Sequence, residues 1–413
     1  MTTSDTRPRG VAILIYLLPA VADMALAQIF FINAVCLARA GASASVVANT
    51  VTVWSVLYLL ACPVIGRFVT PRNAARLMIA SMGGMMTVSL LLIVWRDVVG
   101  IYILTGAAAI SAALFFPPFQ VFMKAVDQAD RKPITYSTGL YTFSWSMGFA
   151  AGPFIAGLLM QVGPGWKSAY AFAASAAAAT GVGIYLLKHL AQADENPTRP
   201  PAARIDGSIT RPLADYSKVP DMVWLGWLAG GTGVVLISVV RAVFPSRAVS
   251  ALHLSDGTQG TLFFLLSFAQ ALTGLALCRS RYWMYRPWAV AAFGVAGMAG
   301  MLALGFGWTP FVLAAGAVLF GVYAWSFFFY LVFHALVHPE RSSRYVAVNE
   351  SVVGIGGIVG PVAGGLMADR VGFGSAFAAS AGLVVAIVAI QWVVHRRHPV
   401  GGPIPVAGPS GLA

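Results

Sequence analysis

The sequence predicts an all-α membrane protein in which 12 transmembrane helices form two pseudo-symmetric six-helix bundles. Of the 413 residues, 59% are hydrophobic and only 10% are charged, whereas a soluble domain has about 25% charged residues. The apolar residues lie in long continuous segments, and the two halves of the chain repeat each other at one offset. Such a chain belongs in a lipid bilayer, where each helical span takes about 20 residues.

The repeat is visible at three places, each about 208 residues apart. Residues 33–40 and 241–248 share four identities, and a Gly-x-x-x-Gly-Pro pattern in 148–157 returns in 356–365. A glycine also closes the second apolar segment of each half at the same offset. Duplicated apolar halves of this size are typical of transporters that rock one half against the other.

Twelve apolar segments carry the predicted spans. In the first half they are 11–36, 45–66, 74–95, 99–123, 136–162 and 168–189, and in the second half 222–245, 257–278, 287–307, 310–336, 345–368 and 374–395. Each is expected to be a helix, because the bilayer core has no water to satisfy an open backbone. The runs lack the alternation that a β-barrel needs.

These segments divide the chain into four regions. Residues 1–190 and 222–398 are expected to form the two bundles, the polar segment 191–221 a cytoplasmic linker, and the Gly/Pro-rich segment 399–413 a disordered tail. The basic start of the chain mimics a signal peptide, but the apolar run behind it is too long for one. We therefore expect that run to remain as the first span.

The distribution of basic residues predicts the topology. Twenty of the 26 Lys and Arg residues lie in segments on the side of the N-terminus, five lie on the opposite side, and Arg241 lies inside a span. The positive-inside rule then places both termini and the linker in the cytoplasm, in a bacterial inner membrane. We interpret the net charge of +12 in the same way and expect no nucleic-acid partner, because the bases form no stripe interleaved with aromatics.

The sequence holds no motif for a catalytic or cofactor site. A Gly-x-x-x-x-Gly-Lys-Ser/Thr loop, a serine nucleophile elbow and a metal-protease helix are missing, and Cys36, Cys62 and Cys278 show neither pairing nor metal-ligand spacing. His334 and His338 lie four residues apart without a third ligand, so we interpret them as a solvated pair. We expect no enzyme activity, no cofactor and no metal.

Twelve spans in two copies, a central cytoplasmic linker and the repeated Gly-Pro pattern resemble the major facilitator superfamily. In that family, the pattern Gly-x-x-x-Gly-Pro-x-x-Gly-Gly in span five marks many proton-driven drug exporters. The matching places in span five and their repeats in span eleven are Gly148, Gly152, Pro153, Gly157, Gly356, Gly360, Pro361 and Gly364. Glycine faces allow helices to approach closely and proline kinks them, so we assign these residues to a hinge between spans five and eight and between spans eleven and two.

The chain also departs from the family. The loop 66–73 has Thr70 where the family usually has an aspartate, and an Asp-Arg-x-Gly sequence appears instead at 369–372, on the other side of the membrane. Tyr102 stands where the drug exporters usually have an arginine in span four. The proton-coupling role of that arginine therefore does not carry over.

Two acids lie inside the predicted spans, Asp23 and Glu350. A charge near the bilayer centre costs about 2.5–3.5 kcal/mol, so it needs a function or a partner. We interpret both as proton-coupling sites, and Asp23 also as a substrate contact, because burial favours the neutral carboxyl while a nearby cation favours the charged form. The alternatives are a structural acid at Asp23 and, at Glu350, a glutamate that reaches the cytoplasmic surface or pairs with a basic residue.

Arg241 and Asn33 occupy equivalent places in the repeat. The arginine is interpreted either as the partner of an acid from the first half or as an anchor for an anionic substrate, and snorkelling to the outer surface is the alternative. Aromatic side chains with a polar group complete the expected substrate site. The residues assigned to it are Asp23, Asn33, Gln120, Tyr141, Trp145, Arg241, Trp325 and Tyr330.

We therefore expect a monomeric secondary transporter that exports small amphipathic or cationic organic molecules in exchange for protons. The alternative is an uptake carrier for a polar or anionic solute, held by Arg241. An intramembrane enzyme or a receptor is a third class, against which the missing catalytic groups and the symmetry of the halves both argue. The expected partners of the transporter are the substrate, protons and the lipid bilayer.

Overall fold

The computed structural model describes residues 9–130, 134–162, 165–188, 221–277, 283, 286–336 and 342–397. Those residues form helices and no strands, which confirms the predicted fold class. The helices are α1 Arg9–Arg39, α2 Ala44–Gly66, α3 Pro71–Val94, α4 Val98–Ala113, α5 Phe116–Asp130, α6 Ile134–Val162, α7 Trp166–Leu187, α8 Val223–Ser250, α9 Asp256–Leu277, α10 Pro287–Phe306, α11 Pro310–Leu336, α12 Ser342–Val371 and α13 Phe373–Arg397. The expected linker up to residue 220, the tail 399–413, Cys278 and His338 lie outside the described residues.

Twelve spans in the described residues are long and apolar enough to cross a membrane. The expected fourth span is present but is not one helix, because α4 ends at Ala113 and α5 begins at Phe116. Pro117 and Pro118 follow at once, and neither can donate a backbone N–H to the preceding turn. The pair of prolines therefore interrupts the helix inside the span, a signal that the continuous prediction 99–123 missed.

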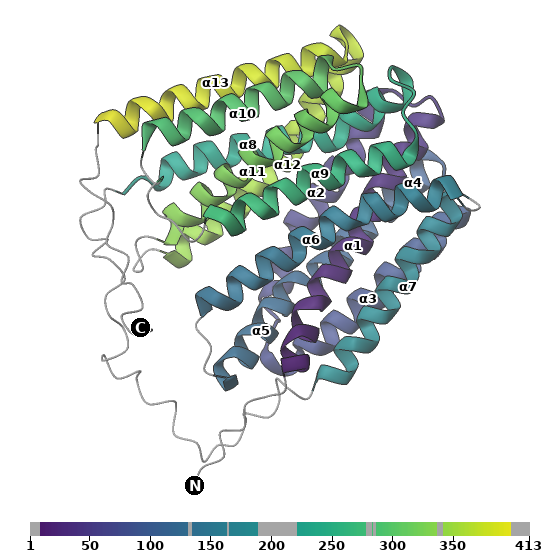
Figure 1. Cartoon of the computed structure of the whole chain (residues 1–413). Coiled ribbons are helices and arrows are strands. Elements are labelled where there is room, and N and C mark those ends of the chain that lie inside the picture. Colours follow the sequence, from purple (N-terminus) through teal and green to yellow (C-terminus); the bar gives the residue numbers. More distant parts are fainter. Residues whose placement is uncertain are drawn as a thin grey trace.

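The spans run back and forth between two ends of the molecule. The first residues of α1 and α8 and the last residues of α7 and α13 lie at one end, here called the linker end (Figure 1). The connections α1–α2, α8–α9 and α12–α13 lie at the opposite end, here called the distal end. Helices α1–α7 belong to the first half of the chain and α8–α13 to the second, and α6 and α9 run side by side where the halves meet.

The glycines of the Gly-Pro pattern set the distance between helices within each half. A Cβ on Gly148 would overlap the backbone of Ala20 in α1, and a Cβ on Gly360 would overlap the backbone of Val235 in α8. Gly152 lies against α1 in the same way, and Gly356 and Gly364 lie against α8. Filling such a contact costs about 1–3 kcal/mol.

The glycine faces of α6 and α12 have partners in both halves. Besides α1 and α8, the expected neighbours are also in contact, because α6 packs along α9 and α12 packs along α2; Gly157 and Gly365 lie at these contacts near the distal end. On its other side, α12 also meets α2, where Gly354 lies against Leu59 and Gly357 against Ser55. Pro153 and Pro361 lie inside α6 and α12 respectively.

Helix caps explain one departure from the family sequence. Thr70 is the N-cap of α3: its hydroxyl accepts the Asn73 N–H at 3.3 Å, and the Asn73 side chain accepts the Thr70 N–H at 2.7 Å. Pro71 occupies the first position of the helix, where its missing N–H costs nothing. Such a cap contributes about 1 kcal/mol, so the residue in place of the family aspartate starts the helix.

Candidate functional site

Two charges meet at mid-depth, where the halves are in contact. Asp23 of α1 has only 5% of its surface exposed and interacts electrostatically with the half-buried Arg241 of α8. The Arg241 guanidinium also lies 4.0 Å from the centre of the Phe149 ring of α6. A cation over an aromatic face is stabilised by about 0.5–2 kcal/mol, and by more as water is excluded. Arg241 thus contacts α6 and faces the buried acid of α1.

The close approach of α1 and α6 brings this group together. Gly148 faces the α1 backbone at Ala20, and the Ser144 hydroxyl donates a hydrogen bond to the Tyr16 carbonyl one turn earlier. Phe149 follows Gly148 directly and so lies at the level of Asp23. The glycine that allows the helices to approach therefore also positions the aromatic ring under Arg241.

The second acid lies closer to the linker end. Glu350 of α12 has an exposed side chain and interacts electrostatically with Tyr58 and Cys62 of α2 and with Tyr141 of α6. Tyr141 also interacts with Asp23 and is hydrogen-bonded to Gln120 of α5. The two acids therefore share Tyr141 as a neighbour, and no ion pair of Glu350 is found among the described residues.

Aromatic rings line α2 beside this acid. The Trp54 and Tyr58 rings are stacked with centres 4.6 Å apart, and Phe30 of α1 meets Trp54 edge-on at 5.3 Å. Trp54 and Tyr58 are one helical turn apart and both are half-buried. Flat apolar groups bind well to such stacked surfaces.

Towards the distal end the halves are closed by aromatic contacts. Phe31 and Phe263 meet edge-on at 6.0 Å across the halves, and Phe154 meets Phe264 at 5.4 Å. Beyond them, an Arg39 nitrogen lies 2.6 Å from an Asp256 carboxylate oxygen. Asp23 and Arg241 are therefore closed off from the distal end.

The structure places several predicted site residues inside a single half. Asn33 is fully buried, where its amide donates to Thr105 at 2.9 Å and accepts from the Tyr170 hydroxyl at 2.5 Å. Tyr330 and Trp325 pack with Trp283 within the second half. Their described contacts lie away from Asp23, Arg241 and Glu350.

Trp145 is half-buried on α6, one turn before Phe149. His334 was expected to be solvated, yet only 2% of its surface is exposed and its ring stacks on Tyr330 at 5.8 Å. The linker end of the second half packs more tightly than the spacing of the histidines suggests.

Sequence reasoning missed Phe149 and Asp256. Phe149 carries no polar group that marks it, and Asp256 lies one residue before the predicted span 257–278, although it is buried. Gln28 was also overlooked: it is fully buried, and neither of its amide atoms has a hydrogen-bond partner among the described residues.

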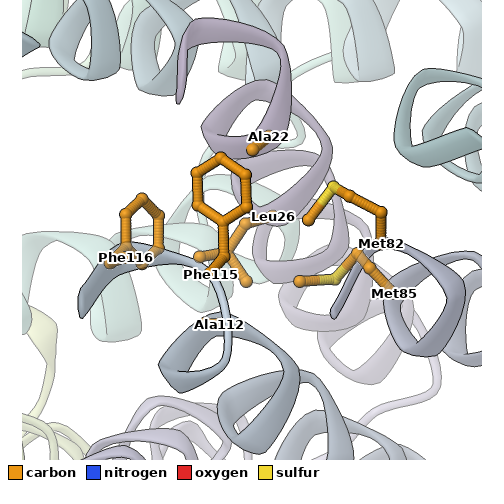
Figure 2. Close-up of a pocket in the computed structure, with 7 residues that line it drawn as sticks. All are labelled: Ala22, Leu26, Met82, Met85, Ala112, Phe115 and Phe116. Carbon is orange, nitrogen blue, oxygen red and sulfur yellow. The ribbon is translucent and has the colours of Figure 1, made fainter. Parts of the chain in front are cut away.

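A small apolar pocket lies inside the first half, between α1, α3 and the break before α5. Figure 2 shows the side chains that line it, and all of them are apolar: Ala22, Leu26, Met82, Met85, Ala112, Phe115 and Phe116. Without a polar group to orient a ligand, this pocket is a packing gap beside Asp23. Among the described residues, no group of three or more His, Cys, Asp or Glu could hold a metal.

Comparison with known families gives one match. The model described as Major Facilitator Superfamily matches residues 13–336. A comparison with curated protein sequences gives no match.

Solved structures share the fold over nearly the whole chain. The nucleoside transporter NupG has a TM-score of 0.70 at 11% identity, covering 94% of this chain and 99% of that one. A bacterial homologue of the human lysosomal transporter Spinster, in an inward-facing and occupied conformation, has a TM-score of 0.64 at 13% identity, covering 96% and 98%. The human organic anion transporter MFSD10 (TETRAN) has 0.61 at 17%, covering 93% and 100%.

Proposed function

Because the chain belongs to the Major Facilitator Superfamily, we propose that it is a secondary active transporter that exports small amphipathic or cationic organic molecules in exchange for protons. The site lies between the two halves, and alternating access exposes it to each side in turn. We place both termini in the cytoplasm of a bacterium and the distal end outside, which makes the described conformation open to the inside. The unit of transport is one chain, since it supplies both halves.

The observation that carries this proposal is the position of Glu350. Its carboxyl lies beside Tyr58 and Tyr141 at the contact between the halves, and no ion pair with a cation is found among the described residues. Such a carboxyl binds either a proton or an organic cation. Competition of the two for one acid is the chemistry of proton-coupled export.

Asp23 has a different role in this proposal, because Arg241 already faces it. When the halves separate, α1 and α8 move apart, and Asp23 loses its interaction with the charge of Arg241. A buried charge without its partner is costly, so Asp23 has to take up a proton or a substrate at that step. Tyr141, which interacts with both acids, connects the two events.

The stacked Trp54 and Tyr58, together with Trp145 and Gln120, are proposed to hold the apolar body of the substrate. The glycines and prolines of α6 and α12 are proposed to let these helices bend as the halves move. Asn33, Trp325 and Tyr330 are proposed to act only through the packing of their own halves.

Purified protein in liposomes tests the proposal, with ethidium as a planar organic cation. An acidic lumen should drive ethidium into the vesicles, and Glu350→Gln should lower that transport at least tenfold, because the neutral amide binds neither species well. Asp97→Asn is the matched control, since Asp97 caps α4 inside the first half. Equal transport by wild type and Glu350→Gln would remove the glutamate from the mechanism.

One observation favours a second candidate, the uptake of a small organic anion. Arg241 lies over Phe149 between the halves, and an anion that binds it would displace Asp23, which then takes up a proton. Benzoate in the same assay separates the two candidates. A cation exporter releases protons when ethidium binds, whereas an anion carrier takes up protons when benzoate binds.

A further inference from the structure

The start of α2 is bonded by a residue of the other half. Asp369 of α12 accepts the Ala44 N–H at 2.7 Å and the Ser45 N–H at 3.0 Å, one with each carboxylate oxygen. The next free N–H, of Val46, reaches the Ser43 hydroxyl at 3.4 Å. The first turn of a helix leaves its N–H groups without partners in the helix itself, so α2 obtains two of its three bonds from across the interface.

The charge of Asp369 is poorly placed in its own helix. It lies in the last turn of α12, which ends at Val371, where the helix dipole disfavours an anion. At the start of α2 the dipole favours an anion, and α2 has no acid in its own first turn. The bond to α2 therefore stabilises the start of that helix and offsets the unfavourable position of the anion at the end of α12.

The repeat makes the equivalent contact without a charge. Gln161 of α6 stands 208 positions before Asp369, and its side chain lies against Gly257 in the first turn of α9. That helix start has its own acid, Asp256, which pairs with Arg39. Each helix start at the distal interface thus has one acid, and only that of α2 comes from the other half.

Two glycines lie directly against the other half and bring these groups into reach; we call them glycine seats. A Cβ on Gly365, one turn before Asp369, would overlap Ser45, and a Cβ on Gly157, one turn before Gln161, would overlap the Asp256 backbone. The two seats occupy equivalent places in the repeat. The distal contact is therefore a built feature of both copies, to which Asp369 adds the charge.

We propose that Asp369 is a positioning residue of the transport cycle: it holds the distal end closed through the start of α2 and has to leave it before that end opens. This role of Asp369 is separate from the proposed substrate site, because it requires only that the halves move apart. Arg39 and Asp256 assist it, but each is already well placed on its own helix and loses less on separation.

Pulsed electron paramagnetic resonance on the full chain in lipid nanodiscs tests the proposal without any substrate. Nitroxide labels at Val94 and Phe311 report the opening, because both positions are exposed, 79% and 83%, at the distal ends of α3 and α11. Asp369→Asn should raise the ratio of long to short distances about tenfold, the effect of losing one charged hydrogen-bond acceptor.

Two further variants act on α2 and keep Asp369 intact. Ala44→Pro removes one bonded N–H at a helix position that suits proline, and Ser43→Asp keeps a good N-cap but places a second anion against Asp369. Both should also increase the long distances, whether or not Asp369→Asn folds. Asp97→Asn, which removes a carboxylate from the start of α4 within one half, should leave them unchanged.

Unchanged distances in Asp369→Asn, or in both α2 variants, would overturn the proposal. An equal shift in Asp97→Asn would also overturn it, because the effect would then follow from lost surface charge. A loss of ethidium transport with normal distal opening would count against the substrate site alone, so the two proposals fail separately.

Discussion

The two halves use equivalent arginines for different purposes. Arg39 of the first half crosses the interface to Asp256. Its counterpart Arg247, 208 positions later, is buried in the second half, where it donates to the carbonyls of Leu304 at 2.8 Å and Gly307 at 2.7 Å. One arginine therefore joins the halves, and the other closes the end of α10 inside one of them.

The same divergence occurs at mid-depth. Asn33 is bonded inside the first half, whereas Arg241, its counterpart, faces Asp23 of the other half. The glycines of the two copies, in contrast, make equivalent contacts with α1 and α8. The repeat thus preserves the packing of the helices, while the charged contacts Arg39–Asp256 and Asp23–Arg241 have no charged counterpart in the other copy.

The largest expected effect compares the two arginines. Arg247→Met leaves two buried carbonyls without a donor and should lower the free energy of unfolding by about 3 kcal/mol. Arg39→Met leaves the buried Asp256 carboxylate without the half-exposed arginine and should cost less, about 1 kcal/mol, because water reaches that side of the pair. Thermal unfolding in detergent measures both, and equal losses would show that the two positions are not specialised.

A smaller effect, equal in the two halves, is expected for the glycines that lie against α1 and α8. Gly152→Val and Gly360→Val should each lower the free energy of unfolding by about 2 kcal/mol, because the new side chain meets the neighbouring backbone. Gly382→Val is the control, since it has no neighbouring atom within 4 Å. Clearly unequal losses at 152 and 360 would contradict the symmetry of the packing.

The smallest effect tests the asymmetric contact at Arg241. Phe149→Leu removes the aromatic face but keeps an apolar side chain, which should weaken the binding of an organic anion to Arg241 by about 0.5–1 kcal/mol, a change of two- to fivefold in KM. Phe149→Tyr should restore the wild-type KM, with kcat similar in all three proteins. Identical KM values for Leu and Phe would show that the ring does not position the arginine.

Composition and periodicity were sufficient to predict the spans. Most predicted ends differ from the structure by a few residues, because a bilayer fixes the length of a helix but not its cap. The errors have local causes: the prolines at 117 and 118 divide the fourth span, and Asp256 stands one residue before the predicted start of the eighth. Both signals, the pair of prolines and the acid at the boundary of the span, are present in the sequence.

The contacts of the site could not be predicted in this way. Asp23, Arg241 and Glu350 stood out because charges are rare in spans, but their neighbours Phe149, Tyr58 and Cys62 come from other helices whose rotation the sequence does not state. The glycine pattern gave the close approach and left the partner helix open. The predicted neighbours α9 and α2 do pack against α6 and α12, but the contacts of Gly148 with α1 and of Gly360 with α8 were overlooked.

Two of the hydrogen bonds that Asp369 accepts come from peptide groups, and the side chains of Ser43 and Ser45 also bond to it. The two peptide N–H groups remain available when residues 44 and 45 are substituted, unless proline enters. Among descendants of this protein, the acid is the member expected to persist while its partners change identity. Covariation between the two positions would then be weak, and a contact essential to gating would leave almost no trace in aligned sequences.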